Sequence, residues 1–348
     1  MNQILVIGGS GYVGSQMIDR LKNSSRNASV HGIDVGWFAD QCDGIGPLPE
    51  TAYDSFTIKD VRDLKESDVE GYESIIYLAA ISNDPMGDRF ADLTRRINHR
   101  EAVRVAQMAR SKGAQQFVLA SSASVYGRGE GDRTEASPLD PQTEYARSKL
   151  AAEADLESLS GPRFAVTCLR FATACGWSPR IRLDLVLNDF VASAVTTQRI
   201  EVLSDGSPWR PLIHVKDMAL AIEWAISAER QSLGPYVVVN VGSRDWNFRI
   251  RELADAVAST LGGIDVSINS DAAPDTRSYR LDFSKWLRIA PNHQPRVSLN
   301  SAIHELAENL SRLSTLDPDF RNSSRVRLRR LQELTAAGYL DDDLRWTS

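Results

Sequence analysis

The chain has 348 residues, 42% of them hydrophobic and 25% charged, which is enough to bury a large core in one or two domains of an ordinary globular protein. The formal net charge is −6, and no basic cluster is dense enough to indicate nucleic-acid binding. No apolar run approaches the ~20 residues of a transmembrane helix, so a membrane protein is not expected either.

The three cysteines, Cys42, Cys168 and Cys175, are an odd number in a long chain and lack metal-ligand spacing. They favour a reducing environment, structural thiols and no metal site. A strand is predicted directly after Gln3, so no signal peptide is expected. The predicted location is therefore cytoplasmic.

The first stretch, residues 4–21, has the sequence ILVIGGSGYVGSQMIDRL, which predicts a buried strand, a glycine-rich turn and a helix. This combination is typical of a dinucleotide site. Gly8 permits the tight turn, Gly11 lets the backbone approach a pyrophosphate, and Gly14 lets the helix pack closely on the strand. The pyrophosphate would then lie at the helix N-terminus, where free N–H groups carry partial positive charge.

A second apolar run, residues 30–35, contains Asp34 about 20 residues past the last glycine. An acid at this place meets the ribose hydroxyls of NAD and repels the 2′-phosphate of NADP, so NAD is the predicted cofactor. The alternative is an ordinary strand, turn and helix with a solvated Asp34. Further on, a short strand at 55–58 runs into Asp60 and Val61, where an acid and the next backbone amide can meet an adenine edge.

Strands are then predicted at 74–80, 115–121 and 164–170, with helices at 91–111 and 144–159 between them. This alternation predicts an α/β fold, with a Rossmann-type doubly wound parallel sheet over residues 1–173 and ligands beyond the carboxyl ends of its strands.

The second half, residues 174–348, is less regular and predicts mainly a smaller C-terminal substrate-binding lid. Strand 237–241 is a candidate to return to the Rossmann sheet. Near the end of the chain, the Arg-rich stretch SSRVRLRRLQEL predicts an amphipathic helix with a solvated basic face.

Tyr145 and Lys149 stand four residues apart in PQTEYARSKLAAE, so they lie on one face of a predicted helix. Tyrosine is a weak base at its usual pKa of about 10, but a nearby ammonium and a positively charged nicotinamide favour the phenolate. It can then take a hydroxyl proton while a hydride leaves the same carbon. This spacing is also common on solvent-exposed helices. The stretch ASSASVYG supports the catalytic interpretation, because serines at the end of a central strand can donate to a sugar hydroxyl or an oxyanion.

These motifs resemble those of the extended short-chain dehydrogenases/reductases of the nucleotide-sugar epimerase/dehydratase family. GGSGYVG, LAAISNDP, SSASVYG, YARSK, LRFATACG and WRPLIHVKD follow the family order over nearly the whole chain. The resemblance implies a catalytic triad of Ser122, Tyr145 and Lys149, of which the last two also contact the cofactor. Asn98 is expected to order its loop at the cofactor. The other implied cofactor contacts, beyond the three glycines and Asp34, are Tyr12, Val13, Asp60, Val61, Leu78, Ala79 and Ala80.

Positions 123 and 124 bear on the reaction. Family members that dehydrate a 4-keto sugar carry an Asp-Glu pair here and decarboxylating members carry a Glu at position 124, whereas this chain has Ala123 and Ser124. Members that epimerise C3 and C5 use a cysteine nearby, and none is present. What remains is epimerisation of a nucleotide-activated sugar at C4, through a transient 4-keto intermediate.

Two other functions remain open. A one-way ketoreductase or dehydrogenase, acting on a keto sugar or a natural-product ketone, uses the same triad. Outside catalysis, the chain could be an NAD-binding sensor or scaffold, although an intact triad counts against that role.

The substrate side departs from the family pattern. Arg210 matches the phosphate-binding arginine, but the Asp that usually follows it is Pro211. The usual diphosphate arginine is Ala272 here, which Arg277 could replace from the other side. Thr173 stands where many 4-epimerases have an Asn. The full set of implied substrate contacts is Ser82, Ser122, Thr173, Asn188, Arg210, Arg277 and Tyr279.

The expected partners are a nucleotide-sugar substrate and a second copy of the chain, and neither nucleic acid nor a membrane is expected. The homodimer, through helices 91–111 and 144–159, is implied by the resemblance alone. His214 lies in an apolar run and is interpreted as a structural, hydrogen-bonded core residue.

Overall fold

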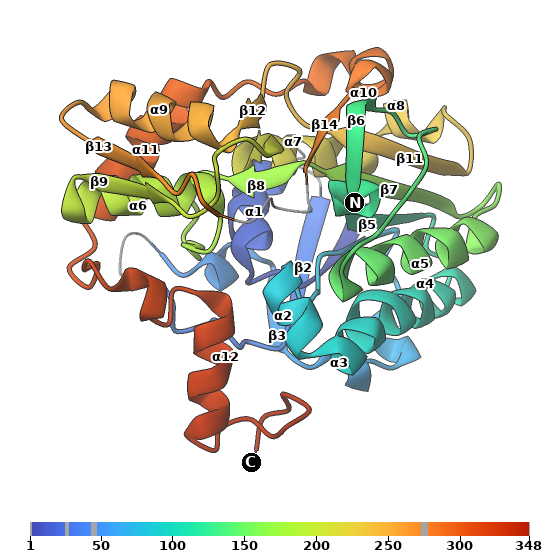
Figure 1. The fold of residues 1–348 in the computed structure, drawn as a ribbon. Coiled ribbons are helices and arrows are strands. Elements are labelled where there is room, and N and C mark those ends of the chain that lie inside the picture. Colours follow the sequence, from blue (N-terminus) through green and yellow to red (C-terminus); the bar gives the residue numbers. More distant parts are fainter. Residues whose placement is uncertain (1, 25–27, 43–46, 273–277, 348) are drawn as a thin grey trace.

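The structure is a computed structural model of the chain and describes residues 2–24, 28–42, 47–272 and 278–347. Its centre is a seven-stranded sheet (Figure 1) in which every adjacent pair runs parallel. This arrangement confirms the predicted α/β fold. From edge to edge the strands are β11 (Tyr236–Val241), β7 (Ala165–Phe171), β5 (Gln116–Ser122), β4 (Ser74–Tyr77), β1 (Asn2–Ile7), β2 (Ala28–Asp34) and β3 (Ser55–Ile58).

The inner strands are apolar on both sides because helices cover both faces of the sheet. One face packs against α1 (Tyr12–Ser24) and α7 (Val215–Ala225), whose buried side chains share a core with β1 and β5. The other face packs against α4 (Ala102–Ser111) and α5 (Glu144–Leu159). Figure 1 shows α4 and α5 lying along each other on that face.

The strand order reverses between β1 and β4. From β1 the sheet continues through β2 and β3 on one side and through β4, β5 and β7 on the other. Connections leave the sheet in opposite directions at this switch point, which opens a crevice at the carboxyl ends of the strands. The sites described below lie there.

The helix predicted over 91–111 is interrupted. It consists of α3 (Ala91–Arg95), a π-helical turn (Arg96–Glu101) and α4. π-Helical turns are rare and occur mostly at functional sites. Here the turn carries Asn98, whose side chain is fully buried toward the crevice loop that follows β4.

A second apolar core lies at one end of the molecule, where Figure 1 shows α6, α9 and α11 grouped together. Three small sheets accompany these helices or join them to the large sheet. The elements concerned are α6 (Val186–Thr197), α9 (Ile250–Leu261), α11 (Leu299–Ser311), β8 (Thr173–Cys175) with β10 (Trp209–His214) and β12 (Asn247–Arg249), β9 (Arg199–Val202) with β13 (Asp265–Ile268), and β6 (Arg128–Arg133) with β14 (Ser278–Leu281).

The second half of the chain does not stay in this end. The α7 helix and β11 return to the large sheet, as does α10 (Ser284–Ile289), whose Trp286 packs on Trp224 of α7. The C-terminal helix α12 (Arg327–Ala336) and the tail after it lie at the foot of the view in Figure 1, near α2 (Asp84–Arg89). Residues 174–348 therefore build most of the second core and also cover parts of the large sheet.

The remaining short helix is α8 (Ala228–Gln231), which follows α7. None of the helices in the described part of the chain has the length and apolarity that crossing a bilayer requires.

Candidate active site

A cavity of about 740 Å³ opens at the carboxyl ends of β1, β2, β4 and β5, and both halves of the chain line it. Its volume falls within the range of cofactor and small-molecule sites. Most of the residues predicted to bind cofactor or substrate lie on its wall. They are Gly8, Gly11, Tyr12, Val13, Gly14, Asp34, Asp60, Val61, Leu78, Ala79, Ala80, Ser82, Ser122, Tyr145, Lys149, Thr173, Arg210 and Tyr279.

The glycine turn after β1 is shaped by contacts that exclude side chains. Gly8 has φ +90°, and a Cβ there would lie 2.5 Å from the backbone nitrogen of Ala79. A Cβ on Gly14 would lie 2.3 Å from the carbonyl oxygen of Gly9. A Cβ on Gly11 would meet only the carbonyl oxygen of Gly8, at 3.5 Å, so that side of the turn is open to the cavity. The N-terminus of α1 and its free N–H groups therefore face a space that suits a diphosphate.

Asp34 ends β2 beside this turn. Its carboxylate accepts hydrogen bonds from the backbone nitrogens of Ser10 (3.1 Å) and Gly36 (2.8 Å). Burial raises the pKa of the carboxyl, and these hydrogen bonds oppose the rise. The group is thus fixed in the cavity wall, at the place where a ribose would lie. Together with the open glycine turn, it makes the site fit NAD.

At the far end of this groove, Asp60 lies on the wall with its carboxylate already engaged. Arg62 donates to it from its backbone nitrogen (2.8 Å) and from its guanidinium (Nη2 to Oδ2, 2.5 Å). The Arg62 guanidinium is buried and also donates to the carbonyl oxygen of Asp343 (2.7 Å). An adenine edge would meet the Asp60 carboxylate in this paired state.

Asn98 does not line the cavity. Its Oδ1 accepts from the backbone nitrogen of Ile81 (2.8 Å), and its Nδ2 donates to the carbonyl oxygen of Ile81 (3.0 Å) and to Ser148 Oγ (3.1 Å). The side chain thus ties the loop after β4 to α5. This is the geometry that an ordering role at the loop requires.

Ser122, Tyr145 and Lys149 converge from two elements. Ser122 ends β5, and the other two lie on the first turns of α5, which Thr143 caps by accepting from the backbone nitrogen of Ala146 (3.2 Å). Lys149 Nζ lies 5.8 Å from the centre of the Tyr145 ring, and the Tyr145 hydroxyl forms a hydrogen bond with Ser122.

Burial sets the protonation of this pair. Burial is the largest cause of the raised pKa of Tyr145, which is about 12. Asp84 also raises this pKa, while the Ser122 hydrogen bond and Arg182 lower it. Burial also lowers the pKa of Lys149 to about 8, and the negative charge of Glu153 opposes this. Without a ligand Tyr145 is therefore a phenol, and more positive charge has to arrive before it can act as a base.

The predicted substrate contacts divide into three groups. Ser82, Thr173, Arg210 and Tyr279 lie on the cavity wall. Asn188 is fully buried behind the wall, where it accepts from the backbone nitrogen of Gly176 (2.9 Å) and donates to the carbonyl oxygen of Arg182 (2.9 Å). Its side chain therefore holds a loop and does not face a substrate. Arg277 lies outside the described residues.

His214 is fully buried, accepts from the backbone nitrogen of Lys216 (3.2 Å) and faces Glu305 at 3.4 Å, as a structural residue would. Among the residues that the structure describes, no group of three or more His, Cys, Asp or Glu side chains is arranged to hold a metal ion.

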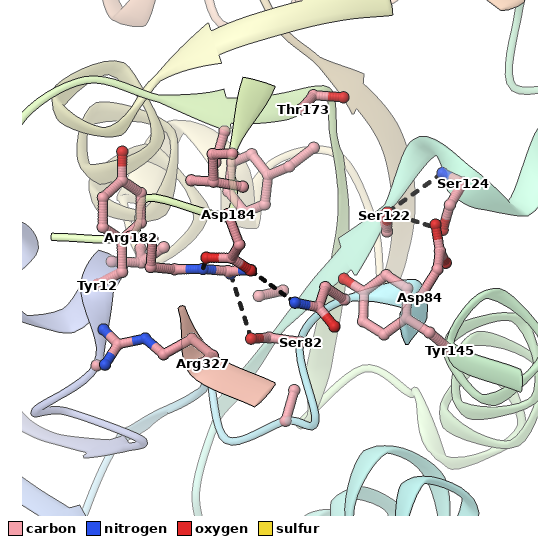
Figure 2. A pocket seen from close by; sticks show the side chains of 18 of the residues that line it. Tyr12, Ser82, Asp84, Ser122, Ser124, Tyr145, Thr173, Arg182, Asp184 and Arg327 are labelled. Atoms are coloured by element: carbon pink, nitrogen blue, oxygen red, sulfur yellow. Dashed lines mark hydrogen bonds and ion pairs between the residues drawn. The ribbon is translucent and has the colours of Figure 1, made fainter. Parts of the chain in front are cut away.

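The sequence interpretation missed an ion pair at the centre of the cavity. Arg182 and Asp184 form a two-pronged pair (Nη2 to Oδ2, 2.7 Å; Nε to Oδ1, 3.1 Å). Arg182 also donates to Ser82 Oγ (3.2 Å), and Asn83 Nδ2 donates to Asp184 (2.6 Å). Figure 2 shows the pair between Tyr12 and Ser82. Burial alone would raise the pKa of the Asp184 carboxyl, but Arg182 holds it below its usual value. The alternating pattern SPRIRLD was the one available signal.

Two further cavity residues were missed. Asp84 lies beside Tyr145 in Figure 2 and accepts a hydrogen bond from Thr143 Oγ1 (2.6 Å). Arg327, at the start of α12, is 2% exposed and lines the cavity. The expectation that the basic face of this helix is solvated was wrong for Arg327 and for Arg325, which is 8% exposed. Periodicity shows which residues share a face, but it cannot show that this face packs against a distant loop.

Known proteins resemble this chain over most of its length. Residues 4–242 match the model of the NAD dependent epimerase/dehydratase family. An uncharacterized UDP-glucose epimerase, YtcB of Bacillus subtilis, is 27% identical over 335 residues, covering 90% of this chain and 98% of that protein. A dTDP-glucose 4,6-dehydratase of Streptomyces niveus is 26% identical, covering 88% and 92%.

A solved structure has the same fold. The UDP-glucose-4-epimerase of Stenotrophomonas maltophila, crystallised with NAD and formylated UDP-arabinopyranose, superimposes with a TM-score of 0.77 at 21% identity, covering 89% of this chain and 98% of that one. The fold, the dinucleotide crevice and the match over most of the chain lead to one conclusion: the chain belongs to the NAD dependent epimerase/dehydratase family, whose cofactor is NAD.

Proposed function

We propose that the protein is an NAD-dependent epimerase that inverts C4 of a nucleotide-activated sugar through a transient 4-keto intermediate. The observation that carries this proposal is the placement of Ser122, Tyr145 and Lys149 on one cavity with the dinucleotide turn. Positions 123 and 124 bring no further acid or base, because Ala123 is buried and the Ser124 hydroxyl donates to Ser122 Oγ (3.0 Å).

The chain's own residues account for the proton movements. NAD, when bound, supplies a hydride acceptor and a positive charge near Tyr145. Tyr145 takes the proton of the C4 hydroxyl through its phenolate oxygen and returns it after the sugar has turned. Lys149 favours the phenolate electrostatically, and Ser122 donates to the sugar oxygen on which charge develops.

The cavity wall also supplies groups for a sugar nucleotide. Arg210 and Tyr279 face the cavity, and Arg210 also donates to the carbonyl oxygen of Trp209 (2.9 Å). A guanidinium forms charge-assisted hydrogen bonds with phosphate, and a phenol can donate another, so these two cavity residues suit the diphosphate of a substrate. Thr173, at the end of the cavity nearer Ser122 in Figure 2, would then contact the sugar.

Isotope tracing tests the reaction directly. We would incubate the protein with UDP-glucose, UDP-N-acetylglucosamine and dTDP-glucose, each carrying deuterium at C4, and analyse the sugars by NMR and mass spectrometry. The expected product is the C4 epimer with deuterium still at C4 and no net NADH. The Tyr145→Phe variant serves as the inactive control.

The same experiment separates the alternatives. A ketoreductase or dehydrogenase, which uses the same triad, would change the cofactor stoichiometrically. A product lighter by one water would indicate dehydration, and Asp84 beside Tyr145 would then be the acid to examine. Tight NAD binding without turnover of any sugar would favour the sensor or scaffold.

We also propose a homodimer through α3, α4 and α5, and a cytoplasmic location. That location suits a chain whose Cys42, Cys168 and Cys175 form no disulfide in the described part of the structure. The family resemblance supports the dimer. On the outer side of α5, Ala154 is exposed and small enough for a partner helix to approach. Light scattering coupled to size exclusion should give a dimer for the wild type and a monomer for Ala154→Arg; equal masses would contradict this interface.

A further inference from the structure

The C-terminal segment, residues 320–346, is fastened to the loop that follows β2. Trp37 Nε1 donates to the carbonyl oxygen of Leu344 (3.0 Å), and Trp346 Nε1 donates to that of Val35 (2.7 Å). Leu331 and Leu344 are buried in the same core as Trp37. The segment therefore lies against the strand end that carries Asp34, next to the cofactor crevice.

This docking brings one guanidinium from the segment into the cavity wall. Arg327 begins α12, and its guanidinium lies 4.0 Å above the ring centre of Phe38. Its Nη1 donates to Gln41 Oε1 and its Nη2 to the carbonyl oxygen of Arg180 (2.9 Å). Both acceptors are neutral, so they position the group without neutralising it.

Within the described residues Arg327 forms no ion pair, although it is buried. Two other arginines, Arg182 and Arg180, lie near it, and each already forms an ion pair with a carboxylate. Asp184 pairs with Arg182, and Glu50 pairs with Arg180 (2.7 Å each). Burial and the charge of Arg182 lower the pKa of Arg327 to about 9, while Asp184 and Asp34 oppose this without hydrogen-bonding it. Buried charges in proteins are normally paired, so this position suits the charge of a bound anion.

The neighbours of Arg327 indicate which anion. The charges of Asp34 and Asp184 both act on the Arg327 guanidinium. Asp34 lies at the end of the cavity that suits the adenosine ribose, and Asp184 bonds to Asn83 toward the end that holds the proposed catalytic residues. In a bound dinucleotide, the diphosphate joins these two ends. Figure 2 shows Arg327 on the same side of the pocket as Tyr12 of the glycine turn and away from Tyr145.

We propose that Arg327 binds the diphosphate of the dinucleotide, opposite the glycine turn, so that the C-terminal segment is part of the cofactor site. This inference rests on the cofactor named in the proposed function and not on the sugar chemistry. The turn supplies N–H donors from one side, and Arg327 supplies a charge-assisted hydrogen bond from the other.

Binding measurements on protein freed of copurified nucleotide test the proposal without any sugar. Arg327→Met keeps the side-chain volume and removes the charge. We expect its Kd for NAD and for ADP-ribose, measured by titration calorimetry, to rise about 10- to 100-fold, while the Kd for adenosine, which has no phosphate, changes little. Arg327→Lys should restore part of the affinity and its salt dependence.

Arg330→Met is the matched control. Arg330 lies on the same helix and fastens it to Asp40 by an ion pair, but it does not line the cavity. Its loss should leave the Kd for ADP-ribose nearly unchanged. The proposal is overturned if Arg327→Met binds ADP-ribose like the wild type, if adenosine binding falls equally, or if only NADP binding falls. Failure of epimerisation with normal nucleotide binding would contradict only the proposed function.

Discussion

At the scale of single residues, burial works against the proton transfer that we propose for Tyr145. The phenol has a pKa of about 12 because it is shielded from water, and the hydrogen bond from Ser122 recovers only part of that rise. A base held in its protonated form until a cation binds beside it cannot act prematurely. The order in which ligands bind would then decide when Tyr145 is active.

Replacing Tyr145 by phenylalanine removes the proton acceptor and little else. We expect turnover to fall by about 10²- to 10⁴-fold, the usual contribution of a positioned acid or base. The Kd for NAD should stay within a factor of about two, because the backbone of the glycine turn is untouched. Steady-state assays and calorimetry measure the two effects, and a near-normal rate would mean that another group is the base.

Burial of the Lys149 charge, which our proposed mechanism uses, lowers the stability of the folded protein. Its pKa is about 8 in the folded protein against 10.5 for the free side chain, because burial disfavours the charge. Between these two pH values the unfolded chain binds more protons, so the unfolding free energy rises with pH across that window. Below about pH 8 both states are protonated, and the full cost, on the order of 3 kcal/mol, is present.

Lys149→Met should therefore be more stable than the wild type at pH 7, although it is inactive. The difference should shrink as the pH rises from 8 toward 10, because the wild type is relieved of its buried charge. Urea unfolding at several pH values measures this. A variant less stable than the wild type at pH 7 would show that Lys149 is held by interactions stronger than the cost of burying it.

At the scale of elements, the π-helical turn Arg96–Glu101 positions the Asn98 side chain against the loop that follows β4. The loop after β4 has a backbone N–H and a C=O at Ile81 that no strand partner satisfies, and Asn98 bonds to both. Buried polar groups of the backbone need such partners. The helix thus departs from regular geometry where its side chain is required to reach the loop.

Asn98→Ala should leave both groups of Ile81 without this partner. We expect a loss of about 2–4 kcal/mol in unfolding free energy and weaker NAD binding, since Leu78, Ala79 and Ala80 lie on the same loop. His99→Ala is the control, because His99 lies on the same turn but bonds outward to Asp155. Equal effects of the two substitutions in urea unfolding would argue that the turn as a whole matters, not the bond to the loop.

At the scale of the whole molecule, the cavity has walls from residues far apart in the chain. Gly8 and Asp34 come from the Rossmann half, while Asp184 and Arg210 come from the second half and Arg327 from the C-terminal segment. A ligand that touches all of them stabilises the assembly of both halves. Assembly of the two halves and ligand binding are then coupled.

Saturating NAD should raise the unfolding temperature of the entire protein in a single transition. At a concentration near 100 times Kd the gain is about 2.7 kcal/mol, which corresponds to roughly 4 °C for a chain of this length. Calorimetry measures the shift, and UDP, which has the diphosphate of a proposed substrate but no nicotinamide, is the comparison. Two separate transitions, of which NAD moved only one, would show that the halves unfold independently.

The fold and the family were predictable from local patterns. Apolar runs such as Ile4–Ile7 and Ser74–Tyr77 are buried on both faces, so periodicity alone indicates their parallel sheet. The glycine turn and the motif containing Tyr145 depend on short spacings within one element or between two neighbouring ones. For the same reason these spacings suffice to name NAD as the cofactor, whereas the sugar and the carbon it reacts at stay proposals.

The remaining site residues could not be found in this way, because their roles arise from contacts between segments distant in the chain. Asn188 matches a family position, but its side-chain amide hydrogen-bonds to the backbone of Gly176 and Arg182. Only the packing of the folded chain reveals these bonds. Arg327 looks like one more surface arginine of an amphipathic helix until that helix docks beside Asp34 and buries it. Spacing along the chain specifies the elements and the motifs that one element carries. Which charges are buried without a counter-ion depends on how the elements pack, because burial and pairing are properties of the assembled molecule.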